Sequence, residues 1–324
     1  MSLHTFDRPD SAAPTIPAAE PIPNTESNGA PPSSRTLPIA VLSLLGAATG
    51  TQVGAALGAH AFPAIGPAGV VAVRQAIAAL VLVPIARPPL HRFTWRQWWP
   101  TLLLGLVFAV MNLSLYIAVD RVGLGLAVTL EVLGPLAVAL AGSRTRLDAF
   151  CAVVAGLGVV VLVAPGPTSD YLGVGFGLLA AVCWAAYILL NRLVGARLPG
   201  LQAPAAASFI SVLMYLPVIA VIAVQGRFTS AALFYGVCAG VLCSVVPYAT
   251  DVVVLRRVPA QFFGVFMSVN PVLAALAGIV VLNQVLNLRE WAGIGIVILA
   301  NTVATIAAGR RRPARPDAFP ESQP

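Results

Sequence analysis

The sequence predicts an all-α integral membrane protein of ten transmembrane helices, built as an inverted repeat of five plus five helices. Three observations support this fold class: the composition, the distribution of arginine and an internal repeat. Of the 324 residues, 58% are hydrophobic and only 10% are charged. This balance is far more apolar than that of an ordinary soluble domain. A soluble core could not bury so large an apolar share.

The apolar runs have the length of spanning helices, which need about 20 residues each. The ten predicted spans are residues 38–57, 66–86, 98–119, 122–142, 148–164, 172–190, 204–224, 232–254, 262–282 and 291–308. The repeats accordingly cover 38–164 and 172–308. The flanking segments 1–37 and 309–324 are polar and rich in proline. We expect both to be disordered tails.

The arginines predict the orientation, because short cytoplasmic loops retain positive charge. All 19 basic residues are arginine, and fifteen of them fall in the two tails and in every second connection between spans. Only Arg121, Arg227 and Arg289 fall in the other connections. The sequence therefore predicts a multi-pass protein of the inner (plasma) membrane with both termini in the cytoplasm. The net charge of +7 comes mainly from arginines in these tails and connections, and it gives no reason to expect nucleic-acid binding.

The internal repeat appears as a nearly constant offset between matching segments. Residues 134–142 match 270–278 at an offset of 136, and residues 155–162 match 292–299 at an offset of 137. Arg121-Val122 matches Arg257-Val258 at 136. Five helices is an odd number, so the second copy enters the membrane from the opposite face. Inverted repeats around a site at the midplane are typical of alternating-access transporters.

Three longer motifs resemble one known family. They are the stretch from Glu131 through Gly134-Pro135 to Ser143-Arg144, the run 183–192 (Cys-Trp-Ala-Ala-Tyr-Ile-Leu-Leu-Asn-Arg), and Val246-Pro247-Tyr248-Ala249 followed by Asp251 and Arg256-Arg257. Together they resemble EamA-type members of the drug/metabolite transporter superfamily, most closely the threonine/homoserine exporter subgroup. The resemblance covers most of residues 38–308.

The resemblance implies a ten-helix inner-membrane carrier that exports amino acids or related metabolites by using an ion gradient. The family pattern has an acid where this chain has Asn270 and another where it has Gln284. A coupling role is therefore not carried over to the second half.

Three ionisable residues lie within spans and away from their flanks: Arg74, Glu131 and Asp251. A charge inside the membrane is costly and usually faces a polar cavity or a partner. Glu131 is a candidate for proton coupling or for binding a substrate amine, and Arg74 for binding a substrate carboxylate. The alternative is a structural ion pair between these two. Asp251 is a candidate for the inner gate, or it extends to the surface toward Arg256.

Uncharged polar and aromatic residues at similar depth are further candidates for the substrate site. They are Gln52, Asn112, Tyr116, Trp184, Tyr187, Tyr248 and Asn270. Each could line a cavity or serve only in helix packing. Glycines recur every four residues from Gly46 to Gly58, which predicts a flat face on the first span, used for close packing or for sliding.

No motif indicates enzymatic chemistry. A nucleotide-binding loop, zinc-ligand spacing and a nucleophile-base arrangement are absent, and the four cysteines lie in apolar runs. We therefore expect no enzyme activity, no cofactor and no metal. The expected partners are a small-molecule substrate, the lipid bilayer and a coupling ion such as the proton. Two alternatives remain: a carrier of the same fold for a drug or other metabolite, and a membrane scaffold without transport.

Overall fold

A computed structural model describes residues 36–141, 145–164, 166, 169–195, 197–198, 201–247 and 268–310. These residues form α-helices with one 3-10 turn and one π-helical turn, and none of them lies in a strand. The elements are α1 (Thr36–Ala59), α2 (Phe62–Ala86), η1 (Leu90–Arg92), α3 (Trp95–Val122), α4 (Leu124–Glu131), α5 (Leu133–Ala141), α6 (Arg146–Val163), α7 (Tyr171–Gly195), α8 (Gln202–Val224), α9 (Ser230–Gly240), η2 (Val241–Val245), α12 (Asn270–Leu282) and α13 (Leu288–Arg310).

The described helices confirm an all-α membrane protein. Seven helical stretches are long and apolar enough to cross a bilayer, with α4 and α5 forming one of them. Shorter apolar helices cover 230–245 and 270–282. The remaining parts of the predicted eighth and ninth spans lie outside the described residues, as does nearly all of both predicted tails.

Several helices extend beyond the spans that hydropathy predicts. The third span was expected from residue 98, with Trp95 preceding it, but α3 begins at Trp95. The reason is a capping box, in which the backbone N–H of Thr94 donates to Gln97 Oε1 over 3.0 Å. Capping depends on polar side chains, which a hydropathy profile counts against a span. In the same way, Thr145 and Asp148 begin α6 at Arg146.

The predicted fourth span is divided into two helices. Pro135 has no N–H, so the carbonyl of Glu131 cannot receive the hydrogen bond that a continuous helix would supply. α4 accordingly ends at Glu131 and α5 begins at Leu133. A second irregularity is η2, where the helix that begins as α9 widens into a π-helical turn. Such turns are frequent at functional sites.

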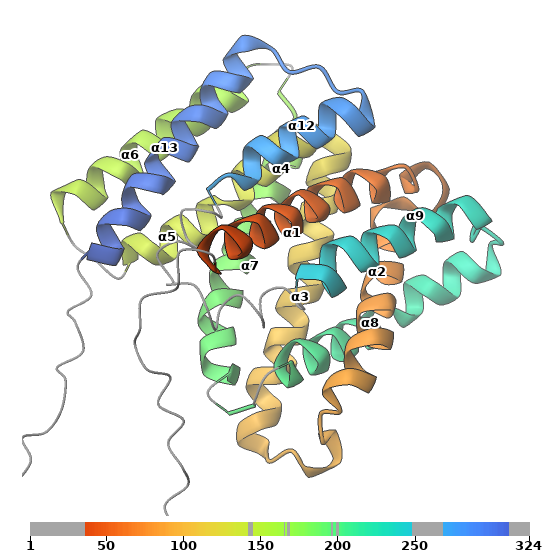
Figure 1. Ribbon diagram of the computed structural model, residues 1–324. Helices are drawn as coiled ribbons and strands as arrows, with labels where there is room; N and C mark the ends of the chain where they lie inside the picture. The colour runs from red at the N-terminus through yellow and green to blue at the C-terminus, as the bar shows by residue number, and fades with distance from the viewer. Residues whose placement is uncertain are drawn as a thin grey trace, which may run out of the picture.

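The helices of the two halves of the chain interleave (Figure 1). α1 packs mainly on α9, η2 and α12, whereas α7 packs mainly on α3, α4 and α5. α2 lies against α8, and α6 lies against α13, at the upper left of Figure 1. Each half thus contributes its first helix to contacts with the other half. The space between α1, α3, α4 and α7 comes to lie near the centre of the molecule.

The glycine face of α1 is a packing surface over part of its length. A Cβ added at Gly54 would lie 2.6 Å from Leu242 Cβ, and one at Gly58 would lie 3.0 Å from Ala239 Cβ. A Cβ at Gly46 would meet no atom within 4 Å. The half of the face nearest the α1–α2 connection therefore lets α1 approach α9 and η2 closely.

Candidate functional site

A cavity of about 210 Å³ lies between the two halves. Helices α1, α2, α3, α4, α7 and α12 contribute to its lining, as does the π-helical turn η2. Its polar and charged lining residues are Thr51, Gln52, Arg74, Asn112, Glu131 and Asn270. The wall also includes the aromatic residues Phe108, Trp184 and Tyr187. The cavity therefore combines a small polar set with an apolar wall, as ligand sites commonly do.

Six of the eight predicted site residues line this one cavity, although they come from six different helices. They are Gln52, Arg74, Asn112, Glu131, Trp184 and Asn270. The other two, Tyr248 and Asp251, lie outside the described residues. Tyr187 also lines the cavity, while Tyr116 is buried behind Arg74.

Arg74 is held in place by the π-helical turn. Its Nε donates to Ser244 Oγ over 3.1 Å, and its Nη2 donates to the carbonyl oxygen of Cys243 over 3.2 Å. The guanidinium carbon lies 5.7 Å from the centre of the Tyr116 ring, which is close enough for a cation–π interaction. A wider helical turn displaces backbone carbonyls from their usual partners, so the Cys243 carbonyl of η2 can accept a hydrogen bond from the Arg74 side chain. These contacts fix the cation at the edge of the cavity.

Glu131 places a carboxylate in the same cavity at the break between α4 and α5. Its side chain is only 8% exposed. Both side chains lie in the described part of the chain, and the direct ion pair with Arg74 that the sequence left open is not formed. The charge of Arg74 still acts on Glu131 electrostatically. The cavity thus contains a guanidinium group and a carboxyl group at separate places on its wall.

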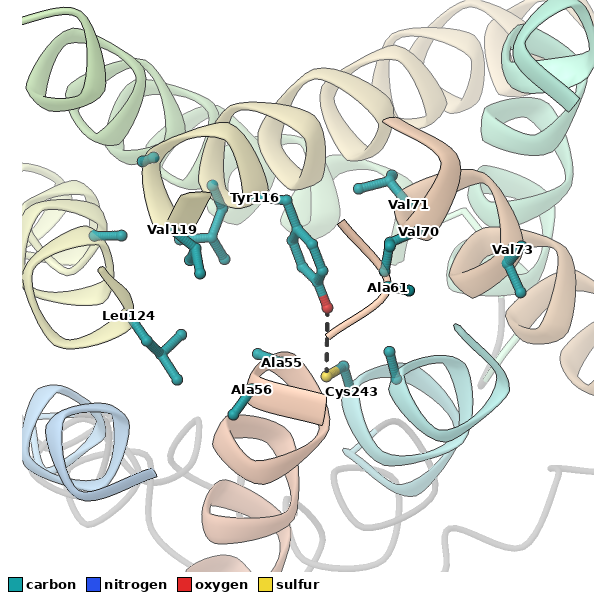
Figure 2. Packing of buried hydrophobic residues seen from close by; sticks show 14 of the residues in the cluster. Ala55, Ala56, Ala61, Val70, Val71, Val73, Tyr116, Val119, Leu124 and Cys243 are labelled. Atoms are coloured by element: carbon teal, nitrogen blue, oxygen red, sulfur yellow. Dashed lines mark hydrogen bonds between the residues drawn. The ribbon is translucent and has the colours of Figure 1, made fainter. Parts of the chain in front are cut away.

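Cys243 and Thr51 are lining residues that sequence reasoning missed. Cys243 Sγ donates to the carbonyl oxygen of Thr51 over 3.1 Å, and the Tyr116 hydroxyl lies 4.0 Å from the same sulfur (Figure 2). These contacts link α1, α3 and η2 beside Arg74. Cys243 was not among the candidates because a π-helical turn has no sequence pattern of its own. Its neighbour Ser244 was missed for the same reason.

The arrangement offers binding groups rather than reactive ones. No group of three potential metal ligands occurs among the described residues. A fixed guanidinium and a carboxylate in an otherwise largely apolar cavity can bind a small molecule that carries both an anion and a cation.

Comparisons with known proteins agree with a transport role. The model of the EamA-like transporter family matches residues 171–306. The threonine/homoserine exporter RhtA of Salmonella typhimurium (strain SL1344) is 36% identical over 288 residues, which cover 87% of this chain and 97% of that protein. RhtA of Escherichia coli (strain K12) is 34% identical over 281 residues, which cover 85% of this chain and 95% of that protein.

A solved crystal structure shares the fold at 19% identity, with a TM-score of 0.53 over 84% of this chain and 98% of that one. The two RhtA proteins align with this chain over almost their whole length. Their identities of 36% and 34% are well above the 19% of the structure that shares the fold. The family resemblance predicted from the motifs is confirmed. The chain belongs to the EamA-like transporter family, and it is a multi-pass membrane transporter.

Proposed function

We propose that this transporter is a secondary carrier that exports small amino acids of the threonine/homoserine type, or related metabolites, across the inner membrane. The observation that carries the proposal is that one basic and one acidic residue, Arg74 and Glu131, line one small cavity. An amino acid is a zwitterion, so it presents one group to each. The names of the RhtA relatives support the same substrate class.

In this proposal Arg74 binds the substrate carboxylate and Glu131 binds the substrate ammonium group. The guanidinium suits the first role because it remains charged and its N–H groups match a carboxylate. Ser244 and Cys243 hold it in place, so little ordering is required when substrate binds. The cavity of about 210 Å³ is smaller than the roughly 300–1,000 Å³ of sites for drug-sized ligands. Gln52, Asn112, Trp184 and Asn270 complete the proposed lining, and Tyr248 and Asp251 stay proposals from the sequence.

Glu131 is also the proposed coupling group. A carboxylate that alternates between a proton and a substrate ammonium group would exchange one for the other during each cycle. Its position at a helix break supports this role, because non-helical backbone within a membrane is tolerated where it lines a cavity.

The proposed architecture is the inverted repeat of ten helices, with repeats 38–164 and 172–308. Under the offset of 136 residues, α1 corresponds to α7, α9 to α3 and α12 to α5. The packing supports the correspondence, because α1 lies on α9 and α12 just as α7 lies on α3 and α5. Both termini are proposed to be cytoplasmic. Alkaline phosphatase fused after Arg310 should then be inactive, and an active fusion would contradict this orientation.

The experiment for the substrate and coupling roles uses purified protein in liposomes with radiolabelled threonine. Glu131→Gln should reduce transport driven by a pH gradient by at least about tenfold, because a hydrogen bond to a charged group contributes about 1.5–3 kcal/mol. The matched control is Asp120→Asn, which removes an exposed carboxylate at the end of α3. It should transport as the wild type does. Unchanged pH-driven transport by Glu131→Gln would refute the coupling role.

A second candidate is a carrier of the same fold for a less polar metabolite or drug. The aromatic wall of Phe108, Trp184 and Tyr187 favours it. In the same liposomes, transport of radiolabelled threonine is compared with transport of a labelled planar organic cation. Labelled threonine should be transported and the labelled organic cation should not, and transport of the organic cation alone would favour the second candidate.

A further inference from the structure

Four exposed arginines gather at one end of the helices, where α3 begins and α7 ends. They are Arg92, Arg96, Arg192 and Arg197. Arg197 Nη1 donates to the backbone carbonyl of Arg96, so the two segments are in direct contact. Figure 1 shows these ends of α3 and α7 near each other, at the lower ends of both helices. Two exposed tryptophans near the start of α3, Trp95 and Trp99, lie with them. We call these six residues the arginine surface.

The charge of the arginine surface is not neutralised within the described part of the chain. None of its four arginines forms an ion pair there. The ion pair found among the described residues lies at the opposite end of the helices, between Arg121 and Asp170. Asp120 and Glu290 also lie at that opposite end. Asp148, at the start of α6, is buried, so among the described residues the end with the arginine surface presents guanidinium groups to its surroundings.

The tryptophans and the neighbouring helix face place the arginine surface at the level of lipid headgroups. Trp95 is 74% exposed, and the Trp99 ring lies 5.9 Å from the guanidinium carbon of Arg197. Exposed tryptophan is typical of the membrane–water interface. Directly beyond Trp99, α3 presents the exposed side chains of Leu102, Leu103 and Leu106. The surface is therefore continuous with an apolar face long enough to contact acyl chains.

From this geometry we infer that the arginine surface binds the headgroup of an anionic phospholipid. A planar guanidinium matches the oxygens of a phosphate and can bind two of them. An anionic lipid contacts both the arginine surface and the neighbouring apolar face. Its phosphate lies on the arginines, and its acyl chains lie against the leucines of α3. Free phosphate or a soluble anion would use the charge but leave the apolar face unused. The inference concerns a different surface from the substrate cavity and does not rest on the proposed function.

The experiment titrates the full-length protein in detergent with phosphatidylglycerol and follows its melting temperature, because a ligand of the native state raises apparent stability. Phosphatidylglycerol should stabilise the protein at lower concentration than phosphatidylcholine does. The test variant is Arg96→Gln/Arg192→Gln, because neither side chain makes a hydrogen bond within the described residues. One arginine near an anionic lipid surface corresponds to about fivefold in affinity. The phosphatidylglycerol concentration at the midpoint of the titration should therefore rise about 25-fold in this double variant.

The matched control is Arg227→Gln/Arg289→Gln, which removes the same charge at the opposite end of the helices. Its midpoint should equal that of the wild type. Equal midpoints for phosphatidylglycerol and phosphatidylcholine would overturn the inference. An equal rise of the phosphatidylglycerol midpoint in the two double variants would also overturn it. In a further arm, inorganic phosphate should neither stabilise the protein nor displace the lipid. Full displacement by millimolar phosphate would show a site for free phosphate instead.

Discussion

Helices α5 and α12 carry closely similar sequences but use one matching position in opposite ways. Gly134 of α5 and Asn270 of α12 each precede a proline and are 136 residues apart. A Cβ at Gly134 would overlap with the carbonyl oxygen of Ala181 and lie 3.2 Å from the amide nitrogen of Ala185. Asn270, by contrast, lines the cavity. In the first half this position brings α5 onto the backbone of α7. In the second half it places an amide at the wall of the cavity.

This difference shows how two helices of similar sequence can form an asymmetric site. The first half supplies the carboxylate of Glu131 one turn before Pro135, at the helix break. The chain carries Met267 at the corresponding position of the second half. Its polar group near the proline is therefore the amide of Asn270. If the proposed amino-acid substrate binds in this cavity, the acid and the amide would distinguish its two ends, which two identical halves could not do.

The largest expected effect tests the packing side of this comparison. Gly134→Ala should destabilise the protein by about 1–3 kcal/mol, because the added methyl group meets the backbone of α7, which cannot rotate away as a side chain would. Thermal unfolding in detergent measures the change. Gly156→Ala on α6 is the matched control, since its Cβ would meet no atom within 4 Å. Equal melting temperatures for the two variants would contradict the close approach of α5 and α7.

A smaller effect is expected where the second half caps a helix of the first. Gln284 Oε1 accepts a hydrogen bond from the backbone N–H of Leu124 over 3.1 Å, at the start of α4. The preceding residue, Gly123, has a φ of 84° and no side chain with which to cap the helix. Gln284→Leu should therefore cost about 1 kcal/mol, the typical loss of a helix cap.

The conservative control at this position is Gln284→Glu. A carboxylate also accepts a hydrogen bond, so this variant should unfold at nearly the wild-type temperature. If Gln284→Glu lost as much stability as Gln284→Leu, the contribution of Gln284 would come from packing against Gly278 and not from the cap. The position at which the family pattern has an acid would then have a different role in this chain.

The features that could be predicted from the sequence are those encoded in local composition. Hydropathy located the helices, and Pro135 indicated the weak point after Glu131. The rarity of charge within spans singled out Arg74 and Glu131, which lie on the same cavity. These signals work because a bilayer penalises each unpaired polar group individually.

The features that could not be predicted depend on contacts between distant segments. Gln284 caps a helix 160 residues earlier in the chain, and Arg74 is held by Ser244, 170 residues later. The helix ends at Trp95 and Arg146 depend on capping side chains that lower local hydropathy. The π-helical turn η2 has apolar residues at most positions and resembles any other span in sequence. Its functional contact, the Cys243 carbonyl, involves no side-chain signal at all.

The smallest expected effect concerns the ion pair between Arg121 and Asp170, which joins the end of α3 to the start of α7. Asp170 accepts a hydrogen bond from the Gly173 N–H over 2.9 Å and lies 3.0 Å from Arg121 Nε. The Gly173 N–H, and then Arg121, hold the pKa of the Asp170 carboxyl below its ordinary value. The corresponding residue before the first repeat, 136 positions earlier, is Ser34, which carries no charge. The pair therefore has no charged counterpart at the matching positions of the repeat.

A carboxyl whose pKa is lowered by folding stabilises the native state above its unfolded pKa of about 3.9, and this contribution is lost as the pH falls through the lower, folded value. Asp170→Asn should therefore lower the melting temperature at pH 7 by no more than about 2 °C, since both partners are partly exposed. The difference from wild type should shrink steadily below about pH 4. Asp120→Asn, at the exposed position next to Arg121, is the control for removing one carboxylate and should melt at the wild-type temperature at pH 7. If the difference in melting temperature between Asp170→Asn and the wild type stayed constant into the acid range, the charge of Asp170 would not be the cause. Asp170 would then act by its shape and hydrogen bonding alone.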